Sequence, residues 1–295
     1  MLRAASWNIL LMGITQKFRR TLRPYGKTAQ AIFRWKRFSF DAVPPVFGNS
    51  KPKSGSHLLL QILSGFTQIM PYRFVEAEPV RTIKQNGGRR AEGDIAVDLR
   101  DIRRGVIGWG YVDVSPDNVA ILCQSNRVNY FIYRDPRDML VSQVFFATDM
   151  HGEHGMHEYY NSLPDFGARL NVAITGIDRD GLKMVSVKQR YEGVFQWLEQ
   201  KHVMCIRFED LINNRDATLT AMLNEVEKTG YKIQTPREKA LALLTDAIQP
   251  NKSHTFRSGK TGGWKQHFNG EHKTLFKNVV GDLLVRLGYE KNNDW

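Results

Sequence analysis

The chain has 295 residues, of which 42% are hydrophobic and 11% aromatic, and its formal net charge is +12. The length suits one large domain with a sizeable core, and the apolar content excludes a disordered or fibrous chain. Two cysteines are too few for a disulfide framework and favour a reducing compartment, so we expect a cytoplasmic protein. No apolar run approaches the roughly 20 residues of a membrane-spanning helix. The positive charge indicates an anionic partner.

The basic residues are concentrated at the front of the chain. Residues 1–40 hold nine of the 42 basic residues and no acidic one, which leaves 33 basic against 30 acidic residues, a net of +3, for the other 255. Most of these charges follow the apolar stretch 7–14, whereas a secretory signal would place them before it. A helix on an anionic membrane surface fits the pattern, but a solvated helix packed on its own domain is favoured. We therefore divide the chain into a basic amphipathic N-terminal segment, residues 1–40, and a near-neutral domain, residues 41–295.

Apolar runs and helical periodicities alternate through the second part. Residues 71–105 are polar and predict a mobile excursion, and residues 151–183 show little periodicity and predict a loop region beside a substrate. Strands that alternate with helices predict an α/β fold, a single domain with a central parallel β-sheet flanked by helices. The predicted strands are Pro44–Ser50, Val128–Tyr133 and His202–Phe208, and the predicted helices are Ser56–Met70, Arg137–Thr148, Val185–Gln200, Ala217–Lys228, Glu238–Ala247 and Glu271–Leu287.

The first candidate site is the segment between the predicted strand at 44–50 and the helix at 56–70. Its sequence, Lys51-Pro-Lys-Ser-Gly-Ser-His57, predicts a P-loop-like strand–loop–helix cradle for a phosphate group. Backbone amides at the start of the helix would face the anion, Gly55 would allow close approach, and Lys53 would add a charge. The alternative is a capped helix with solvated lysines. The segment lacks the G-x-x-x-x-G-K-[S/T] pattern of nucleotide triphosphatases, which disfavours that class.

Two further segments combine arginine with hydroxyl or small residues. Arg134 directly follows the predicted strand at 128–133, at the edge where open α/β sheets bind ligands, and Ser142 on the next helix could share an anion with it. The alternative is a surface ion pair of Arg134 with Asp135 or Asp138. The third segment, FRSGKTGGWK at residues 256–265, interleaves basic and hydroxyl side chains with glycines, as an anion-binding loop or a flexible loop does.

In this order and spacing, the three segments resemble the PAPS-dependent sulfotransferases from about Val43 to Tyr289, with the bacterial small-molecule branch nearest. The resemblance implies transfer of a sulfuryl group from 3′-phosphoadenosine 5′-phosphosulfate (PAPS) to a hydroxyl or amine-type nitrogen of a small molecule, a bacterial natural product being one option. The product nucleotide would be adenosine 3′,5′-bisphosphate (PAP), and no metal is expected.

The resemblance also implies roles for single residues. Lys53 matches the lysine that assists the leaving oxygen, and Ser258 stands where the family usually has a lysine, a loss for which Lys260 could compensate. The implied nucleotide contacts are Lys53, Ser54, Gly55, Ser56 and His57 for the 5′-phosphosulfate, Arg134 and Ser142 for the 3′-phosphate, and Arg257, Ser258 and Gly259 in the C-terminal loop.

The acceptor base departs from the family pattern. Tyr111 stands where the family commonly has a histidine, and a phenol is a poor base at neutral pH. Asp113 shares strand parity with Tyr111 and is the first candidate for the base. A histidine of the run His151, His154 and His157 is the alternative, with His151 as its representative. Zinc binding by this run is disfavoured because two glycines interrupt it.

The acceptor and the rival functions remain open. Acidic residues near the histidine run (Asp149, Glu153 and Glu158) suggest a polar acceptor, with a cationic one as an option, although an acidic solvated loop explains them as well. One rival is a metal-dependent, kinase-like phosphotransferase that uses the same cradle, but it lacks a convincing carboxylate set. The other is a nucleic-acid-binding protein, which the +3 balance of the main domain disfavours, so no nucleic-acid partner is expected. The oligomeric state is not predicted.

Overall fold

The computed structural model describes residues 26–84, 88–179, 181–253 and 257–295. Its centre is a six-stranded parallel sheet in the order β2-β4-β1-β5-β8, in which β3 also pairs with β4. The strands are β1 (Val46–Ser50), β2 (Phe74–Val75), β3 (Val80–Arg81), β4 (Val106–Tyr111), β5 (Val128–Tyr133) and β8 (Met204–Arg207). Every residue of β1 and β5 is buried, as an inner parallel strand requires. The predicted single-domain α/β fold is confirmed.

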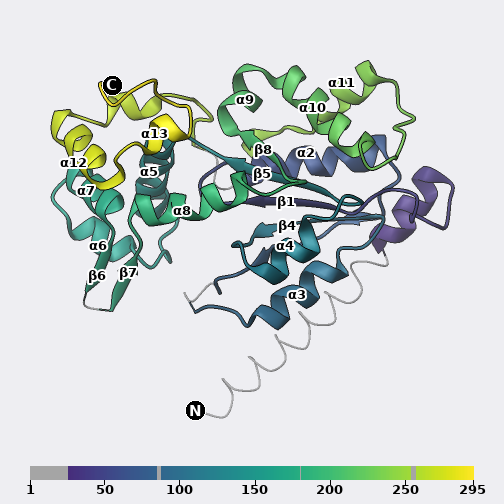
Figure 1. The fold of residues 1–295 in the computed structure, drawn as a ribbon, viewed down its shortest axis with the longest axis horizontal. Helices are drawn as coiled ribbons and strands as arrows, with labels where there is room; N and C mark the ends of the chain where they lie inside the picture. Colours follow the sequence, from purple (N-terminus) through teal and green to yellow (C-terminus); the bar gives the residue numbers. More distant parts are fainter. Residues whose placement is uncertain (1–25, 85–87, 180, 254–256) are drawn as a thin grey trace, which may run out of the picture.

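Helices cover both faces of the sheet (Figure 1). On one face lie α2 (Ser56–Ile69), α9 (Phe208–Asn213), α10 (Arg215–Glu227) and α11 (Arg237–Ala247), and on the other lie α3 (Glu92–Asp101) and α4 (Pro116–Leu122). In α2 the apolar residues recur at helical spacing, and Leu59, Ile62, Leu63, Phe66 and Ile69 are all buried. None of the helices in the described part of the chain is both long and apolar enough to cross a membrane.

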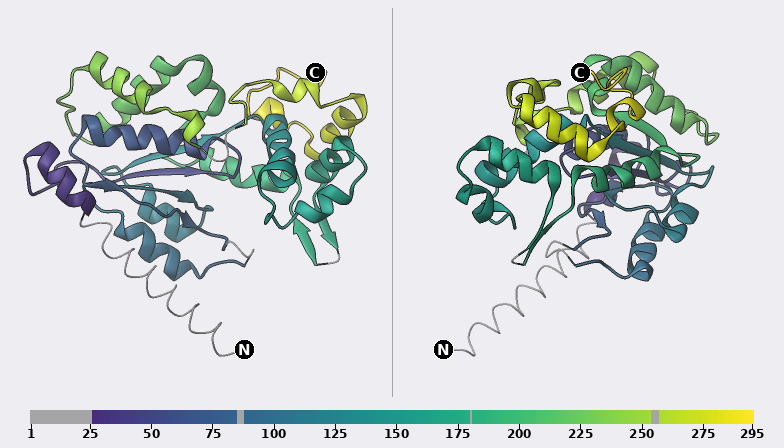
Figure 2. Two further views of the ribbon diagram at one scale, coloured as in Figure 1. Left: turned by 180° about the vertical axis from the view of Figure 1, so that it is seen from behind. Right: turned by 60° about the vertical axis from the view of Figure 1, so that its left-hand side comes forward.

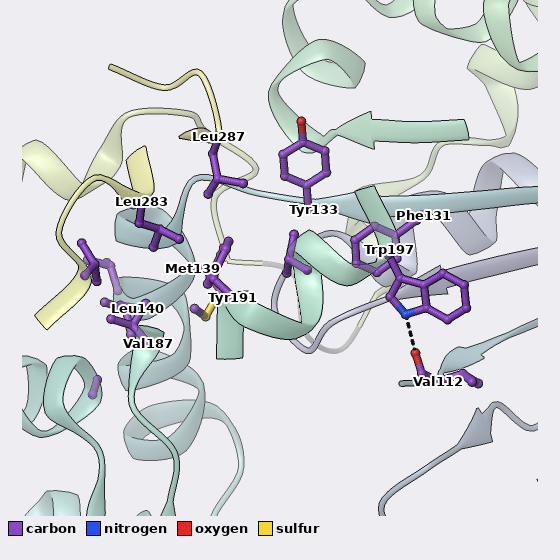
Figure 3. Packing of buried hydrophobic residues seen from close by; sticks show 14 of the residues in the cluster. Val112, Phe131, Tyr133, Met139, Leu140, Val187, Tyr191, Trp197, Leu283 and Leu287 are labelled. Carbon is purple, nitrogen blue, oxygen red and sulfur yellow. Dashed lines mark hydrogen bonds between the residues drawn. The ribbon is translucent and has the colours of Figure 1, made fainter. Parts of the chain in front are cut away.

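A further group of helices gathers at one end of the sheet, beyond β5 (Figures 1 and 2). It contains α5 (Pro136–Phe145), the π-helical turn η1 (Phe146–Met150), α6 (His157–Ser162), α7 (Phe166–Thr175), α12 (Gly270–Val280), α13 (Leu283–Arg286) and the hairpin β6 (Ile177–Arg179) and β7 (Leu182–Met184). Helix α8 (Val187–Leu198) contacts β5 as well as α5, α7 and α12, and so joins this group to the sheet. There Trp197 Nε1 donates a hydrogen bond to the Val112 carbonyl at 2.9 Å (Figure 3).

Three expectations from the sequence need correction. Residues 71–105 contain β2, β3 and α3, and residues 151–183 contain α6, α7 and the β6–β7 hairpin, so neither stretch is a plain loop. Helix α3 was missed because only Ile95, Ala96 and Leu99 form its buried stripe. The helix predicted at 271–287 is interrupted at Gly281, which adopts φ 60° and separates α12 from α13. Of the N-terminal segment 1–40, residues 1–25 lie outside the described residues, and its separation from the domain stays a prediction.

Candidate active site

The loop between β1 and α2 places the predicted cradle at the carboxyl end of a central strand. Lys53 and Gly55 adopt φ 68° and 99°, both in the left-handed region, and the Ser54 amide donates to the Lys51 carbonyl at 3.2 Å. Two features require glycine at position 55. Its φ lies in the left-handed region, and a Cβ there would lie 2.7 Å from Cδ2 of Phe208. A left-handed lysine is an uncommon conformation that is typical of functional loops.

Helix α2 begins at Ser56 with its positive end uncompensated. Among the described residues no side chain caps it, and its first turn has no acidic residue. Every other described α-helix of at least six residues whose start is described has one or the other. The amides at the start of this 14-residue helix therefore offer a site for an anion. The hydroxyl of Tyr111 donates to Ser56 Oγ at 2.9 Å, which places this residue of β4 at the cradle.

Gly55→Ala is expected to lower the free energy of unfolding by about 2–4 kcal/mol, because it adds left-handed strain to the clash with Phe208. It should also weaken nucleotide binding by deforming the cradle. Urea denaturation measures the first effect. Gly93→Ala is the matched control, since no atom lies within 4 Å of its added Cβ and it sits inside α3. Equal stability of Gly55→Ala and the wild type would contradict the assigned backbone conformation.

Three predicted cations converge beside the cradle. Burial, together with the nearby positive charges of Arg134 and Arg257, lowers the pKa of Lys53 to about 8. The ammonium of Lys53 lies 4.0 Å from the centre of the Phe146 ring, and the guanidinium of Arg257 lies 4.3 Å from that of Phe145. Like charges held together in this way repel one another until an anion binds between them.

Arg134, which follows β5, and Arg137, on α5, have different environments. Arg137 is enclosed by two carboxylates at 2.7 and 2.5 Å and is fully used within the fold. Arg134 is only 8% exposed, donates to the Lys260 carbonyl at 3.0 Å, and has its nearest carboxylate oxygen, on Asp138, at 3.9 Å. Within the described residues its Nε has no hydrogen-bond partner. Arg134 therefore keeps a buried donor that a ligand can satisfy.

Asp138 fixes the C-terminal loop against α5. Its two carboxylate oxygens accept hydrogen bonds from the amides of Gly262, at 2.7 Å, and Trp264, at 2.8 Å. The sequence identified Asp138 only as a first-turn helix residue or an ion-pair partner, and this role was missed. No local sequence signal could have found this role, because Asp138 lies 124 and 126 positions from the two amides.

The other predicted nucleotide contacts lie around these cations. Ser54 is buried, and His57 is half-buried in the first turn of α2. Ser142 is half-buried on α5, and within the described residues no hydrogen bond uses its hydroxyl. The loop residues Ser258 and Gly259 are half-buried. The structure thus brings the first two segments and residues 257–265 of the third to one end of the sheet, while Phe256 lies outside the described residues.

Asp113 lies just beyond β4 and is held by two cations. Its carboxylate pairs with Lys51 Nζ at 2.5 Å and with the Arg89 guanidinium at 3.6 Å. Lys51 belongs to the same loop as Lys53, so this ion pair connects the first base candidate with the cradle. The sequence did not single out Lys51 as a partner of Asp113, because 62 residues separate them.

Two histidines pack against the ring of Phe146, on which Lys53 also packs. The ring centres of His151 and His154 lie 5.3 and 5.8 Å from that of Phe146. His151, the predicted candidate, is exposed, whereas His154 is half-buried. Burial lowers the pKa of His154, and the neighbouring cationic groups add to this, so its ring is neutral at pH 7. The amide of Met156 donates to His154 Nδ1 at 3.1 Å, which leaves the ring proton on Nε2. His154 is therefore a hydrogen-bond donor that the sequence did not separate from its neighbours.

The acidic residues of this region lie at the surface, and the charge of Asp149 acts on Arg257. Asp149, Glu153 and Glu158 are all exposed. Among the described residues, no group of three or more His, Cys, Asp and Glu side chains is arranged to hold a metal ion.

Comparisons with known proteins add to this geometry. The family model described as the sulfotransferase domain matches residues 124–288, more than half of the chain. A solved mouse sulfotransferase complexed with PAP is similar over 83% of this chain and 87% of that chain, with 16% identity and a TM-score of 0.55. Retinol dehydratase in complex with androsterone and inactive cofactor PAP is similar over 81% and 80%, with 13% identity and a TM-score of 0.53. No curated protein matches the sequence.

Proposed function

The chain belongs to the sulfotransferase domain family, and we propose that it moves a sulfuryl group from PAPS to a hydroxyl or amine-type nitrogen of a polar small molecule. The observation that carries the proposal is the meeting of Lys53, Arg134 and Arg257 beside the uncapped start of α2. Three cations and a helix start suit a nucleotide with anionic groups at two of its positions.

The residues present fit PAPS. When bound, PAPS supplies a sulfuryl group that is already joined to a phosphate leaving group. The loop from Lys53 to His57 would hold the 5′ end, where the α2 amides face the anion. Arg134, whose Nε has no partner among the described residues, would hold the 3′-phosphate together with Ser142 and the loop at 257–259. Two solved structures of this fold contain PAP, which supports the same choice of ligand.

Lys53 and His154 have different electrostatic roles in this proposal. Lys53 places positive charge where negative charge gathers on the leaving oxygen, and its pKa of about 8 also allows it to pass on a proton at neutral pH. The Nε2–H of His154 offers a neutral donor near Phe146. Tyr111 donates its hydroxyl proton to Ser56, so we assign it to the shape of the cradle.

For the acceptor proton we propose Asp113, with His151 as the alternative. Asp113→Asn is expected to lower kcat/KM for the acceptor by about 10²–10⁴-fold, because it removes the base. His151→Gln should change it less than about five-fold, since the ring is exposed. Steady-state sulfation rates measure both, and an unchanged PAP affinity of each variant is the control for an intact cradle. The reverse order of effects would move the base to His151.

The pKa of Lys53 predicts a pH dependence. The charged form binds an anion, so affinity for PAP should be full below pH 8 and fall as the pH rises through about 8. Arg257→Gln removes one of the repelling cations, so the fall should shift to higher pH even though the variant binds PAP more weakly. Calorimetric titrations between neutral and alkaline pH measure both curves. An identical midpoint in the two proteins would show that Arg257 does not act on Lys53.

Calorimetry with PAP in the presence and absence of Mg²⁺ tests the function itself. Binding that does not depend on Mg²⁺, together with transfer of labelled sulfate from PAPS, is the expected result. A metal-dependent phosphotransferase would bind the nucleotide well only with Mg²⁺. Failure to bind PAP under either condition would refute the proposal.

We further propose a cytoplasmic location. Cys123 and Cys205 are both free in the structure. Burial raises the pKa of both thiols, that of Cys205 to about 11, so they stay protonated at neutral pH. Free, protonated thiols fit a reducing compartment such as the cytoplasm.

A further inference from the structure

Two phenylalanine rings project into solvent at the front of the described chain. Phe33 is 88% exposed and Phe38 is 87% exposed, whereas no other large hydrophobic side chain in the described residues is more than 56% exposed. Single exposed apolar residues are ordinary, but two uncovered rings only five positions apart in the chain concentrate apolar surface in one short segment. Removing such a surface from water lowers the free energy.

Contacts of its helix with the body of the protein hold Phe33 outward. Residues 26–35 are helical, and Lys27 and Arg34 donate to the carbonyls of Val75, at 3.0 Å, and Thr67, at 3.2 Å. Ala31 on this helix is buried, and Phe33 lies about 200° around the helix from it, on the opposite side. The fixed helix therefore cannot turn Phe33 inward without losing these contacts. It lies at the far end of the sheet from α5, α7 and α12 (Figure 1).

Basic side chains accompany the rings. Lys36 and Arg37 are exposed between Phe33 and Phe38, and neither takes part in a salt bridge within the described residues. No acidic residue occurs in residues 1–40, and residues 1–25 contribute five further basic residues. The partner of this surface must therefore be anionic as well as able to take up aromatic rings.

We propose that this aromatic-basic surface (Phe33, Lys36, Arg37 and Phe38) docks the protein on an anionic lipid bilayer. Aromatic rings at the boundary between headgroups and acyl chains, with lysine and arginine beside them at the headgroups, are the usual composition of interfacial segments. We choose the bilayer over an acidic protein or a nucleic acid because it presents anionic headgroups and an apolar layer along one continuous surface, where two exposed rings can be buried without a shaped pocket. The nucleotide site, at the other end of the sheet, stays accessible in this orientation.

Flotation of the full-length protein with vesicles tests the proposal. We expect it to bind an equal mixture of phosphatidylserine and phosphatidylcholine and to bind phosphatidylcholine alone much more weakly. Phe33→Ala/Phe38→Ala should lower the partition coefficient about ten-fold or more. Lys36→Gln/Arg37→Gln should lower it roughly five-fold per charge and reduce its dependence on salt.

Matched controls come from the β7–α8 region. Val185→Ala removes an apolar side chain that is 46% exposed, and Lys183→Gln/Lys188→Gln removes two exposed charges; neither change should alter binding. Unchanged PAP affinity shows that each variant is folded. Absence of vesicle binding, or equal binding to neutral vesicles, would overturn the proposal. The proposal would also be overturned if Phe33→Ala/Phe38→Ala bound the vesicles as tightly as the wild type does. Charge alone would then account for the binding, and an acidic protein or a nucleic acid could be the partner instead.

Discussion

Lys53→Ala is expected to lower kcat by about 10²–10³-fold while the affinity for PAP falls much less. The ammonium is half-buried, packs on the Phe146 ring and belongs to the cradle loop, so its charge acts where the leaving oxygen would lie. Charge on that oxygen is greatest in the transition state, and for this reason the loss should appear in kcat. Single-turnover sulfation rates and calorimetric binding of PAP separate the two effects.

Lys53→Arg distinguishes a fixed charge from a proton donor. A guanidinium keeps the charge but does not release its proton near neutral pH. If the pKa of about 8 serves proton transfer, the arginine variant should recover PAP affinity but little of the rate. Full recovery of the rate would show that charge alone is needed. A wild-type rate in Lys53→Ala would remove Lys53 from the chemistry.

Arg134→Ala is expected to weaken PAP binding by about 30- to 1,000-fold, the range for a buried charged partner of a phosphate. Binding of the analogue without the 3′-phosphate should change less than about three-fold. The reason is the buried guanidinium, whose Nε has no partner in the described residues, so that the phosphate meets donors already removed from water. Calorimetric titration with both nucleotides gives the ratio directly.

Arg137→Met serves as the contrast for Arg134→Ala. Arg137 is enclosed by Asp135 and Glu290, so its loss should lower the stability of the fold by several kcal/mol and weaken both nucleotides alike. Arg134→Ala should instead discriminate between the nucleotides with little loss of stability. Equal losses of affinity for both nucleotides in Arg134→Ala would refute its assignment to the 3′-phosphate.

The central strands and the cation cluster were predictable because their signals are local. Continuous apolar runs mark β1 and β5, and helical spacing marks α2, so the loops that follow these strands could be placed at one sheet edge. The order of the three segments then indicated that Lys53, Arg134 and Arg257 meet. Their effect on one pKa agrees with that expectation.

The missed parts depend on contacts between distant residues. The hydrogen bonds from Gly262 and Trp264 to Asp138 join residues 124 and 126 positions apart, and no local sequence pattern predicts them. His151 and His154 are three positions apart, and only the packing around Phe146 makes one exposed and the other half-buried. Helix α3 has a buried stripe too narrow to be separated from a polar loop by periodicity.

The uncapped start of α2 makes the stability of the fold depend on binding of the donor. Because the chain supplies neither a capping side chain nor an acidic residue there, a bound phosphate group would act as the missing N-cap of the helix beside the central strand. At a donor concentration a hundred times its Kd, binding would add about 2.7 kcal/mol to the folded state. Depletion of PAPS would therefore lower the stability of the fold as well as the rate of sulfation.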